Sequence, residues 1–158
     1  MNFDECFAAL LAHEGDYANL ENDPGGKTRY GVTETVARGA GYTGDMRALP
    51  ISLAKTIYRS LYWDAVRGEE LPDGIRYFVF DAAAASGVRQ SILWLQRALG
   101  VAADGILGPV TLAAAHAANP DKLKARLLSQ RLRFMAGLSN WPSFSRGWSR
   151  RVADLLEA

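Results

Sequence analysis

The chain has 158 residues, of which 49% are hydrophobic and 22% charged, a composition typical of a globular domain rather than a disordered or fibrous protein. Folding at this size removes about 70% of the extended chain's surface from water, so the core needs neither metals nor disulfides. The 18 basic and 17 acidic residues leave a net charge of +1. That balance provides no general attraction to nucleic acid or membranes.

Three features of the sequence bear on where the protein is made. The single cysteine, Cys6, falls on the apolar side of the first expected helix, where a free thiol is typically a small buried hydrophobe. Asp4 and Glu5 stand where a signal peptide requires positive charge. No apolar run approaches the roughly 20 residues that span a bilayer. We therefore expect a soluble product of the cytoplasm without membrane insertion.

Apolar residues at helical spacing predict a mainly α-helical chain. The expected helices cover residues 3–13, 33–38, 51–62, 75–85, 91–99, 109–118, 121–138 and 145–156. The segment 15–33 interrupts this spacing with glycines and polar residues, and it predicts a loop with a short β-hairpin. A soft boundary near 86–90 divides the chain into halves 1–87 and 88–158, which we expect to pack as one compact unit.

Asp81 is an acid inside an expected helix, 75–85, that is apolar almost all round. Such a helix is typically buried at the centre of a domain. A buried acid must be paired or hydrogen-bonded, because an isolated charge there is costly. We therefore favour a structural role for Asp81 over a catalytic one.

Glu14 and Asp23 are the candidates for acid and base chemistry. Breaking a glycosidic bond requires a carboxylic acid that protonates the leaving oxygen, and usually a second carboxylate acting as base, nucleophile or electrostatic support. Glu14 follows the C-terminal end of the first expected helix, where the helix dipole disfavours the ionised form of an acid. Asp23 lies on a polar loop, where a carboxylate stays ionised. Environments that separate two carboxylates in this way are typical of an acid and base pair.

The segments 13–19 and 23–33 read HEGDYAN and DPGGKTRYGVT, and they closely resemble the signature of the glycoside hydrolase family 108 N-acetylmuramidases. Members of that family often look like phage or prophage endolysins. The resemblance continues in segments 62–64, 71–74, 80–81 and 86–87. It extends through 94–96, 99–101 and 104–109, which look like the family's C-terminal peptidoglycan-binding region. Segment 104–109 also carries strong turn signals, and we favour a turn there over a binding site for wall peptide.

The resemblance implies a lysozyme-like helical domain whose loop or β-hairpin forms a wall beside the active-site cleft. It implies that Glu14 is the general acid and that Asp23 matches the aspartate of the loop. The order of Glu14, Asp23 and Thr28 is also similar to the catalytic layout of phage-type lysozymes, in which a threonine holds the attacking water. Thr33 is the alternative to Thr28 in that role. The implied reaction is hydrolysis of the β-1,4 bond between N-acetylmuramic acid and N-acetylglucosamine in bacterial peptidoglycan.

Flat aromatic side chains are the usual surfaces for sugar rings, and several stand near the motif. We expect substrate contacts from Tyr17, Asn19, Tyr30, Tyr62 and Trp63. For Tyr62 and Trp63, core packing is an equally good interpretation of the aromatic pattern. No cofactor or metal is expected, since the sequence has no paired cysteines and no His-Glu-x-x-His motif.

The sequence departs from the family pattern at two places. Asp16 stands where relatives tend to have a second glycine, and it places a further negative charge beside Glu14. Ala84 and Ala85 stand where relatives usually have a valine and an asparagine. Loss of that amide removes a polar contact near the floor of the cleft, from which we expect weaker activity or an altered substrate.

Two alternatives to a muramidase stay open at this stage. A lytic transglycosylase would keep Glu14 but release anhydro sugars. A wall-binding or secretion-associated protein could keep the fold without catalysis, and its basic C-terminal segment 122–151 could dock on the cell wall, although a solvated helix surface explains that segment as well. Nucleic-acid binding is not expected. We expect a bacteriolytic monomer that acts on the wall, in the periplasm, after release through a holin.

Overall fold

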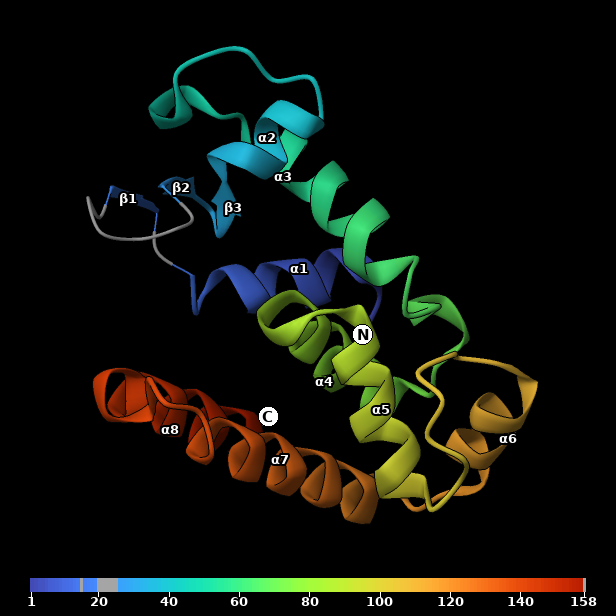
Figure 1. Cartoon of the computed structure of the whole chain (residues 1–158). Coiled ribbons are helices and arrows are strands. Elements are labelled where there is room, and N and C mark those ends of the chain that lie inside the picture. Colours follow the sequence, from blue (N-terminus) through green and yellow to red (C-terminus); the bar gives the residue numbers. More distant parts are fainter. Residues whose placement is uncertain (15, 20–25, 158) are drawn as a thin grey trace.

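The computed structural model of the chain describes residues 1–14, 16–19 and 26–157. These residues form eight α-helices and one small sheet (Figure 1). The helices are α1 Phe3–Leu11, α2 Glu34–Gly39, α3 Ile51–Tyr58, α4 Asp73–Ser86, α5 Val88–Leu99, α6 Pro109–Ala117, α7 Pro120–Ala136 and α8 Trp141–Glu157. Shorter turns are η1 Met46–Ala48, η2 Arg59–Trp63 and η3 Gly68–Glu70, of which η2 is π-helical. The predicted mainly α-helical, lysozyme-like fold is confirmed.

The sheet lies in the segment for which a short β-hairpin is predicted, and it has three short strands. They are β1 Tyr17–Asn19, β2 Lys27–Arg29 and β3 Val32–Thr33, antiparallel in the order β1-β2-β3. Arg29 pairs with Val32, so only two residues connect β2 to β3. A connection of that length defines a tight hairpin, and it fixes the position of the turn relative to the rest of the sheet.

Among the differences from the predicted helix bounds, two have local reasons. The last helix begins at Trp141, four residues before the predicted start, because Pro142 lies in its first turn. Proline is tolerated there, since the first N–H groups of a helix have no partner inside it. The predicted helix 51–62 divides into α3 and the π-helical turn η2. Single π turns inside helices frequently occur at functional sites.

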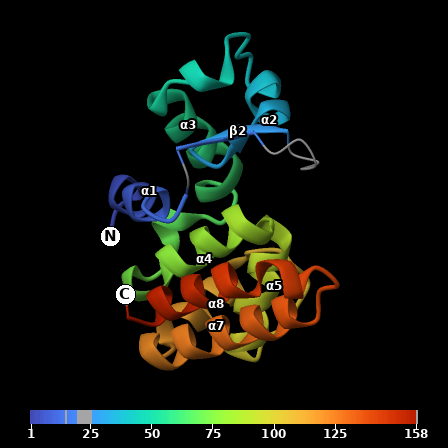
Figure 2. The ribbon, with the colours of Figure 1, turned by 90° about the vertical axis from the view of Figure 1, so that its left-hand side faces the viewer.

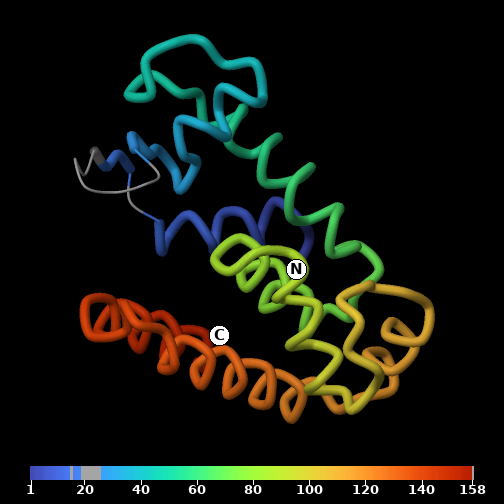
Figure 3. Tube along the Cα trace, viewed as in Figure 1, coloured from blue at the N-terminus to red at the C-terminus, as the bar shows by residue number. Residues whose placement is uncertain are grey.

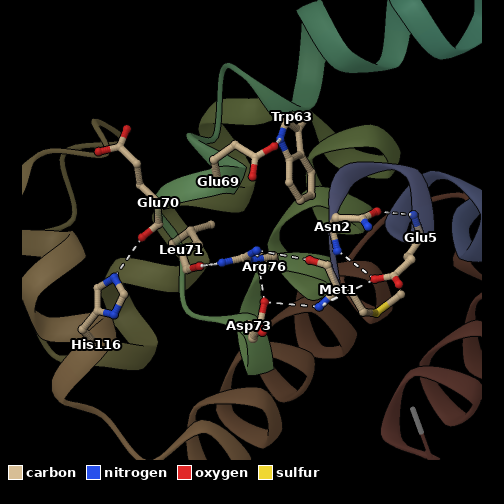
Figure 4. Close-up of polar contacts among 10 residues, drawn as sticks. All are labelled: Met1, Asn2, Glu5, Trp63, Glu69, Glu70, Leu71, Asp73, Arg76 and His116. Carbon is tan, nitrogen blue, oxygen red and sulfur yellow. Dashed lines mark hydrogen bonds and ion pairs between the residues drawn. The ribbon is translucent and has the colours of Figure 1, made fainter.

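Polar contacts at the N-terminus attach the start of α1 to the start of α4 (Figure 4). The ammonium group of Met1 lies 3.2 Å from Asp73, and Arg76 lies 3.0 Å from the same carboxylate. Arg76 also donates to the carbonyl oxygens of Leu71 and Met1. The hydrogen bond from the ammonium group, with the charge of Arg76, lowers the pKa of Asp73. These contacts hold the N-terminal end of α1 against the start of α4.

The interior beneath α1 is an aromatic cluster. Phe3 contacts Trp63 and Phe80 at centroid distances of 5.4 and 6.1 Å, and Trp63 meets Phe80 edge-on at 5.5 Å. Edge-to-face contacts of this kind are favourable beyond the area that they bury. Cys6 lies among these side chains with 0% of its surface exposed, as predicted for a buried hydrophobe. The cluster holds α1 rigidly against η2 and α4.

Helices α5 and α7 of the second half pack against α4, and α8 packs against α7. Figure 2 shows α4, α5, α7 and α8 together on one side of α1, with β2, α2 and α3 on the other side. The trace in Figure 3 shows α8 returning antiparallel to α7. The loop between α5 and α6 is fixed by the buried amide of Gln96, which donates to Asp104 and accepts from the N–H of Gly105. Segment 104–109 thus contains a turn held by Gln96.

Candidate active site

Glu14 lies one turn beyond the end of α1. Its N–H donates to the carbonyl of Leu11 at 3.1 Å, and the N–H of His13 donates to Leu10 at 3.0 Å, so the chain stays coiled up to Glu14. Leu10 is fully buried, and it anchors this end of the helix in the core. The Glu14 side chain keeps 29% of its surface exposed. The carboxyl group is therefore held by a rigid helix and remains accessible.

The β2–β3 turn comes directly against Glu14. Its two central residues, Tyr30 and Gly31, have φ angles of 52° and 74°, and positive φ at both positions is what a type I′ turn requires. A Cβ added to Gly31 would lie 3.0 Å from Oε2 of Glu14 and would overlap the hydroxyl of Tyr58. Only glycine lets the turn approach the carboxylate this closely.

Tyr58 and Tyr62 form a second side of the environment of Glu14. Their rings lie 5.4 Å apart, and Tyr58 is buried whereas Tyr62 is half-buried. Burial, and to a smaller extent the negative charge of Glu14, raises the pKa of both phenols. Both hydroxyls therefore stay protonated at neutral pH and are available as donors beside the carboxylate.

Four charged side chains form a chain of ion pairs that begins at Glu14. Nη1 of Arg151 lies 3.2 Å from Oε1 of Glu14, and Nη2 of Arg151 lies 2.5 Å from Oδ1 of Asp81. Arg131 pairs with the other oxygen of Asp81. Burial alone would raise the pKa of Asp81, but the charges of Arg131 and Arg151 outweigh it and lower the pKa. Pairing of the buried acid was predicted, and two arginines provide it.

A cavity of about 380 Å³ opens beside Glu14. Helices α7 and α8 supply most of its lining, and the residues around it are Glu14, Ala85, Ser86, Arg131, Phe134, Met135, Leu138, Trp148 and Arg151. Ala85, one of the two departures from the family pattern, is part of this wall. The expected loss of a polar group therefore falls beside the candidate acid.

Comparison with known families assigns the chain. Residues 7–87 match the model of the family described as Glycosyl hydrolase 108. The chain belongs to this family. Residues 90–153 match a second family, described as Predicted Peptidoglycan domain. Family 108 membership together with this region makes the protein a glycoside hydrolase that acts on peptidoglycan.

A solved structure supports the family 108 assignment. SagA of Brucella abortus is 32% identical in sequence, with a TM-score of 0.88. The match covers 98% of this chain and 91% of that one. None of the curated protein sequences matches this chain. The similarity to SagA extends over both regions of the family 108 chain, so the two regions share one arrangement in both proteins.

Three of the residues predicted in the polar segment of this family 108 protein, Asn19, Thr28 and Thr33, lie in the sheet. Thr28 occupies the centre of β2, and its hydroxyl donates to the carbonyl of Gly26 at 3.4 Å. The hydroxyl of Thr33, the alternative to Thr28, accepts from the N–H of Val36 and caps α2. Asn19 lies in β1. Asp23 lies outside the described residues.

The predicted aromatic contacts divide into accessible and buried side chains. Tyr17 and Tyr30 are half-buried, and each has a guanidinium over its ring, from Arg47 at 5.2 Å and from Arg29 at 4.9 Å. Tyr62 is also half-buried and lies near Glu14.

Trp63 requires a correction, because none of its surface is exposed. Its ring packs against Phe3 and Phe80, and its N–H donates to Glu69 at 3.3 Å. A ring without exposed surface has no face to offer a sugar, so Trp63 belongs to the core. The packing interpretation holds for this residue.

The negative charge of Asp16, the other departure from the family pattern, has a cationic neighbour. Its carboxylate lies 3.4 Å from Nε of Arg29, and its carbonyl accepts from the N–H of Tyr30 at 3.0 Å. The extra negative charge is thus partly compensated by Arg29. This contact also ties the segment after Glu14 to the hairpin.

Sequence reasoning missed the contribution of the second half to this site. Arg151 and Trp148 come from α8, and Arg131 and Phe134 come from α7. The one available signal was Asp81, since a buried acid needs cationic partners. Segment 122–151 offers many arginines and lysines, and nothing in their spacing singles out two of them.

Two further findings concern metals and membranes. Within the described ranges, no group of three or more His, Cys, Asp or Glu side chains is arranged to hold a metal ion. None of the helices that the structure describes has the length and apolar character needed to cross a membrane.

Proposed function

We propose that this family 108 hydrolase is an N-acetylmuramidase, which hydrolyses the β-1,4 bond between N-acetylmuramic acid and N-acetylglucosamine. Glu14 donates a proton to the leaving oxygen. Asp23 stabilises the developing positive charge or activates water, and Thr28 orients that water. The division into a catalytic half, 1–87, and a peptidoglycan-binding half, 88–158, is part of the same proposal.

The position of Glu14 is the observation that carries this proposal. A rigid helix end presents its carboxyl group to a cavity, between a tight hairpin turn and two protonated phenols. A general acid needs such a fixed position within reach of the leaving oxygen, because proton transfer depends on geometry before it depends on acidity. The half-buried rings of Tyr17, Tyr30 and Tyr62 supply surface for neighbouring sugars.

One contact favours a second candidate function. The guanidinium of Arg151 lies 3.2 Å from Oε1 of Glu14 and occupies that oxygen, which is then not available to a substrate. Together with Ala85 in the cavity wall, this contact favours a peptidoglycan-binding protein without catalysis. Such a protein would sediment with peptidoglycan and leave the length of the glycan strands unchanged.

The test uses purified peptidoglycan and three proteins: wild type, Glu14→Gln, and Glu157→Gln as a control that removes an exposed acid at the end of α8. We expect the wild type and the control to clear the suspension and Glu14→Gln to leave it turbid while still folded. Clearing by Glu14→Gln would exclude Glu14 as the acid. Binding without clearing by all three would favour the second candidate.

Analysis of the products separates the possible reactions. Borohydride reduction of muramidase products converts the terminal N-acetylmuramic acid to its alditol, whereas glucosaminidase products give the alditol of N-acetylglucosamine. Lytic transglycosylase products carry anhydro ends, lighter by one water molecule, and are not reduced. Mass spectrometry of reduced fragments therefore tests the proposed bond and the proposed chemistry together. A phage origin, release through a holin and a monomeric state stay predictions.

A further inference from the structure

We propose that Arg151 is a positioning residue for Glu14, so that the region matching the peptidoglycan domain completes the active site instead of serving only as a binding module. This inference rests on the proposed role of Glu14 as the acid. It adds that Arg151 fixes the direction of the carboxyl group.

The division of charges between the two family regions is the first argument. Both acids of the ion-pair chain, Glu14 and Asp81, lie in the region that matches the hydrolase family. Both bases, Arg131 and Arg151, lie in the region that matches the peptidoglycan domain. Neither region satisfies its own charges at this site. In the folded chain, loss of both arginines would leave a fully buried carboxylate without a cation, which is strongly unfavourable.

The shape of the guanidinium is the second argument. Arg151 uses Nη1 for Glu14 and Nη2 for Asp81, with Nε 3.5 Å from the second oxygen of Asp81. A planar guanidinium holds its donors in a fixed fork, so binding to Asp81 determines where Nη1 points. Asp81 is itself held by Arg131. Glu14 is therefore oriented by a side chain that is oriented in turn from the core.

The anchoring of α8 is the third argument. Val152 and Leu155 are buried, so the backbone that follows Arg151 is fixed against the rest of the fold. Asp154 lies three residues after Arg151, on the same face of the helix, and its carboxylate is 3.7 Å from Nδ1 of His13. His13 and Glu14, which follow α1, thus contact Asp154 and Arg151, which lie about one turn apart on α8.

The experiment measures kcat and KM from pH 4 to 9 on soluble peptidoglycan fragments for wild type, Arg151→Met, Arg151→Lys and the control Arg150→Met. Arg150 is the exposed neighbour on the same helix, and its replacement removes the same charge. For Arg151→Met we expect kcat to fall about tenfold from lost orientation with little change in KM. Arg150→Met should keep both parameters.

Arg151→Lys separates charge from shape. A lysine keeps the cation, but a single ammonium group cannot reproduce the fork, so kcat should still fall severalfold. Wild-type kcat in both Arg151 variants would overturn the inference.

A measurement of stability keeps the inference testable without activity. Melting temperatures of Glu14→Gln, Arg151→Met and the double variant form a double-mutant cycle. If the two side chains interact, the double variant loses less than the sum of the single losses, whereas additive losses would overturn the contact. An active Glu14→Gln variant would end the proposed function. An inactive Glu14→Gln variant with an unchanged kcat in Arg151→Met would end only this inference.

Discussion

Asp81 on α4 and Arg131 on α7 form an ion pair from which solvent is excluded, with 0% and 2% of their side-chain surfaces exposed. Removing one partner of a buried pair leaves an uncompensated charge, so Asp81→Asn should lower the free energy of unfolding by about 3–5 kcal/mol. Urea unfolding at pH 7 measures this. Asp64→Asn breaks the exposed pair with Arg59 and should cost less than about 1 kcal/mol. Equal losses in the two variants would contradict the prediction.

The same acid predicts how stability depends on pH. The pKa of Asp81 is lower in the folded protein than its ordinary value, because the two arginines outweigh the effect of burial. Its contribution is therefore complete above the unfolded-state pKa of about 3.9, and it is lost as pH falls through the folded pKa. We expect the stability of the wild type to fall steeply below about pH 4 and that of Asp81→Asn to fall less. Parallel curves from urea unfolding at pH 2.5 to 7 would contradict this.

Trp63 and Tyr62 predict opposite effects although they are neighbours in η2. Trp63→Phe leaves a void in the aromatic cluster and should cost about 1–3 kcal/mol of stability, with activity per folded molecule unchanged. Tyr62→Phe removes a hydroxyl near Glu14 and should lower kcat/KM with a small change in stability. Melting temperature and kcat/KM together test both variants. A stable Trp63→Phe protein with impaired substrate binding would restore the predicted sugar contact.

How much the sequence predicts depends on the distance over which a contact acts. The helix before Glu14 and the turn-rich segment after it follow from local spacing, and the described residues of both lie as expected. The same pattern does not distinguish Tyr62 from Trp63, although Trp63 is buried and Tyr62 is half-buried. Local spacing predicts the element that bears a side chain better than the direction in which the side chain points.

The contact between Glu14 and Arg151 joins residues 137 positions apart. The buried position expected for Asp81 indicates that it has cationic partners. Which basic residues of segment 122–151 pair with it depends on how α7 and α8 pack in the fold. No periodicity encodes that packing angle. The position of Ala85 in the cavity wall depends on the same packing, because residues of α7 and α8 form most of the rest of that wall.

Cys6 should be unreactive in the folded protein. Burial raises the pKa of its thiol to about 11, and the reactive form is the thiolate. At pH 8 we therefore expect Ellman's reagent to detect no thiol in the native protein and one thiol per chain in denaturant. Rapid labelling of the native protein would show that α1 opens from the aromatic cluster on the time scale of the assay.

Gly31→Ala and Gly41→Ala separate the effect of backbone conformation from the effect of contact with Glu14. Both glycines have positive φ, at 74° and 85°, so alanine strains each backbone by about 1–2 kcal/mol. A Cβ at position 41 meets no atom within 4 Å, whereas one at position 31 displaces Tyr58 and the carboxyl group of Glu14. Melting temperatures should therefore fall in both variants, and further in Gly31→Ala.

The activities of the two variants should differ far more than their stabilities. Displacement of a catalytic group by about 1 Å can cost about 100-fold in rate, so kcat of Gly31→Ala should fall by one to two orders of magnitude. Gly41→Ala should keep its kcat, because its turn does not touch the candidate site. If both variants lost activity in proportion to their stability, the close approach of the hairpin to Glu14 would have no catalytic role. A selective loss in Gly31→Ala would establish that the turn between β2 and β3 positions the carboxyl group of Glu14.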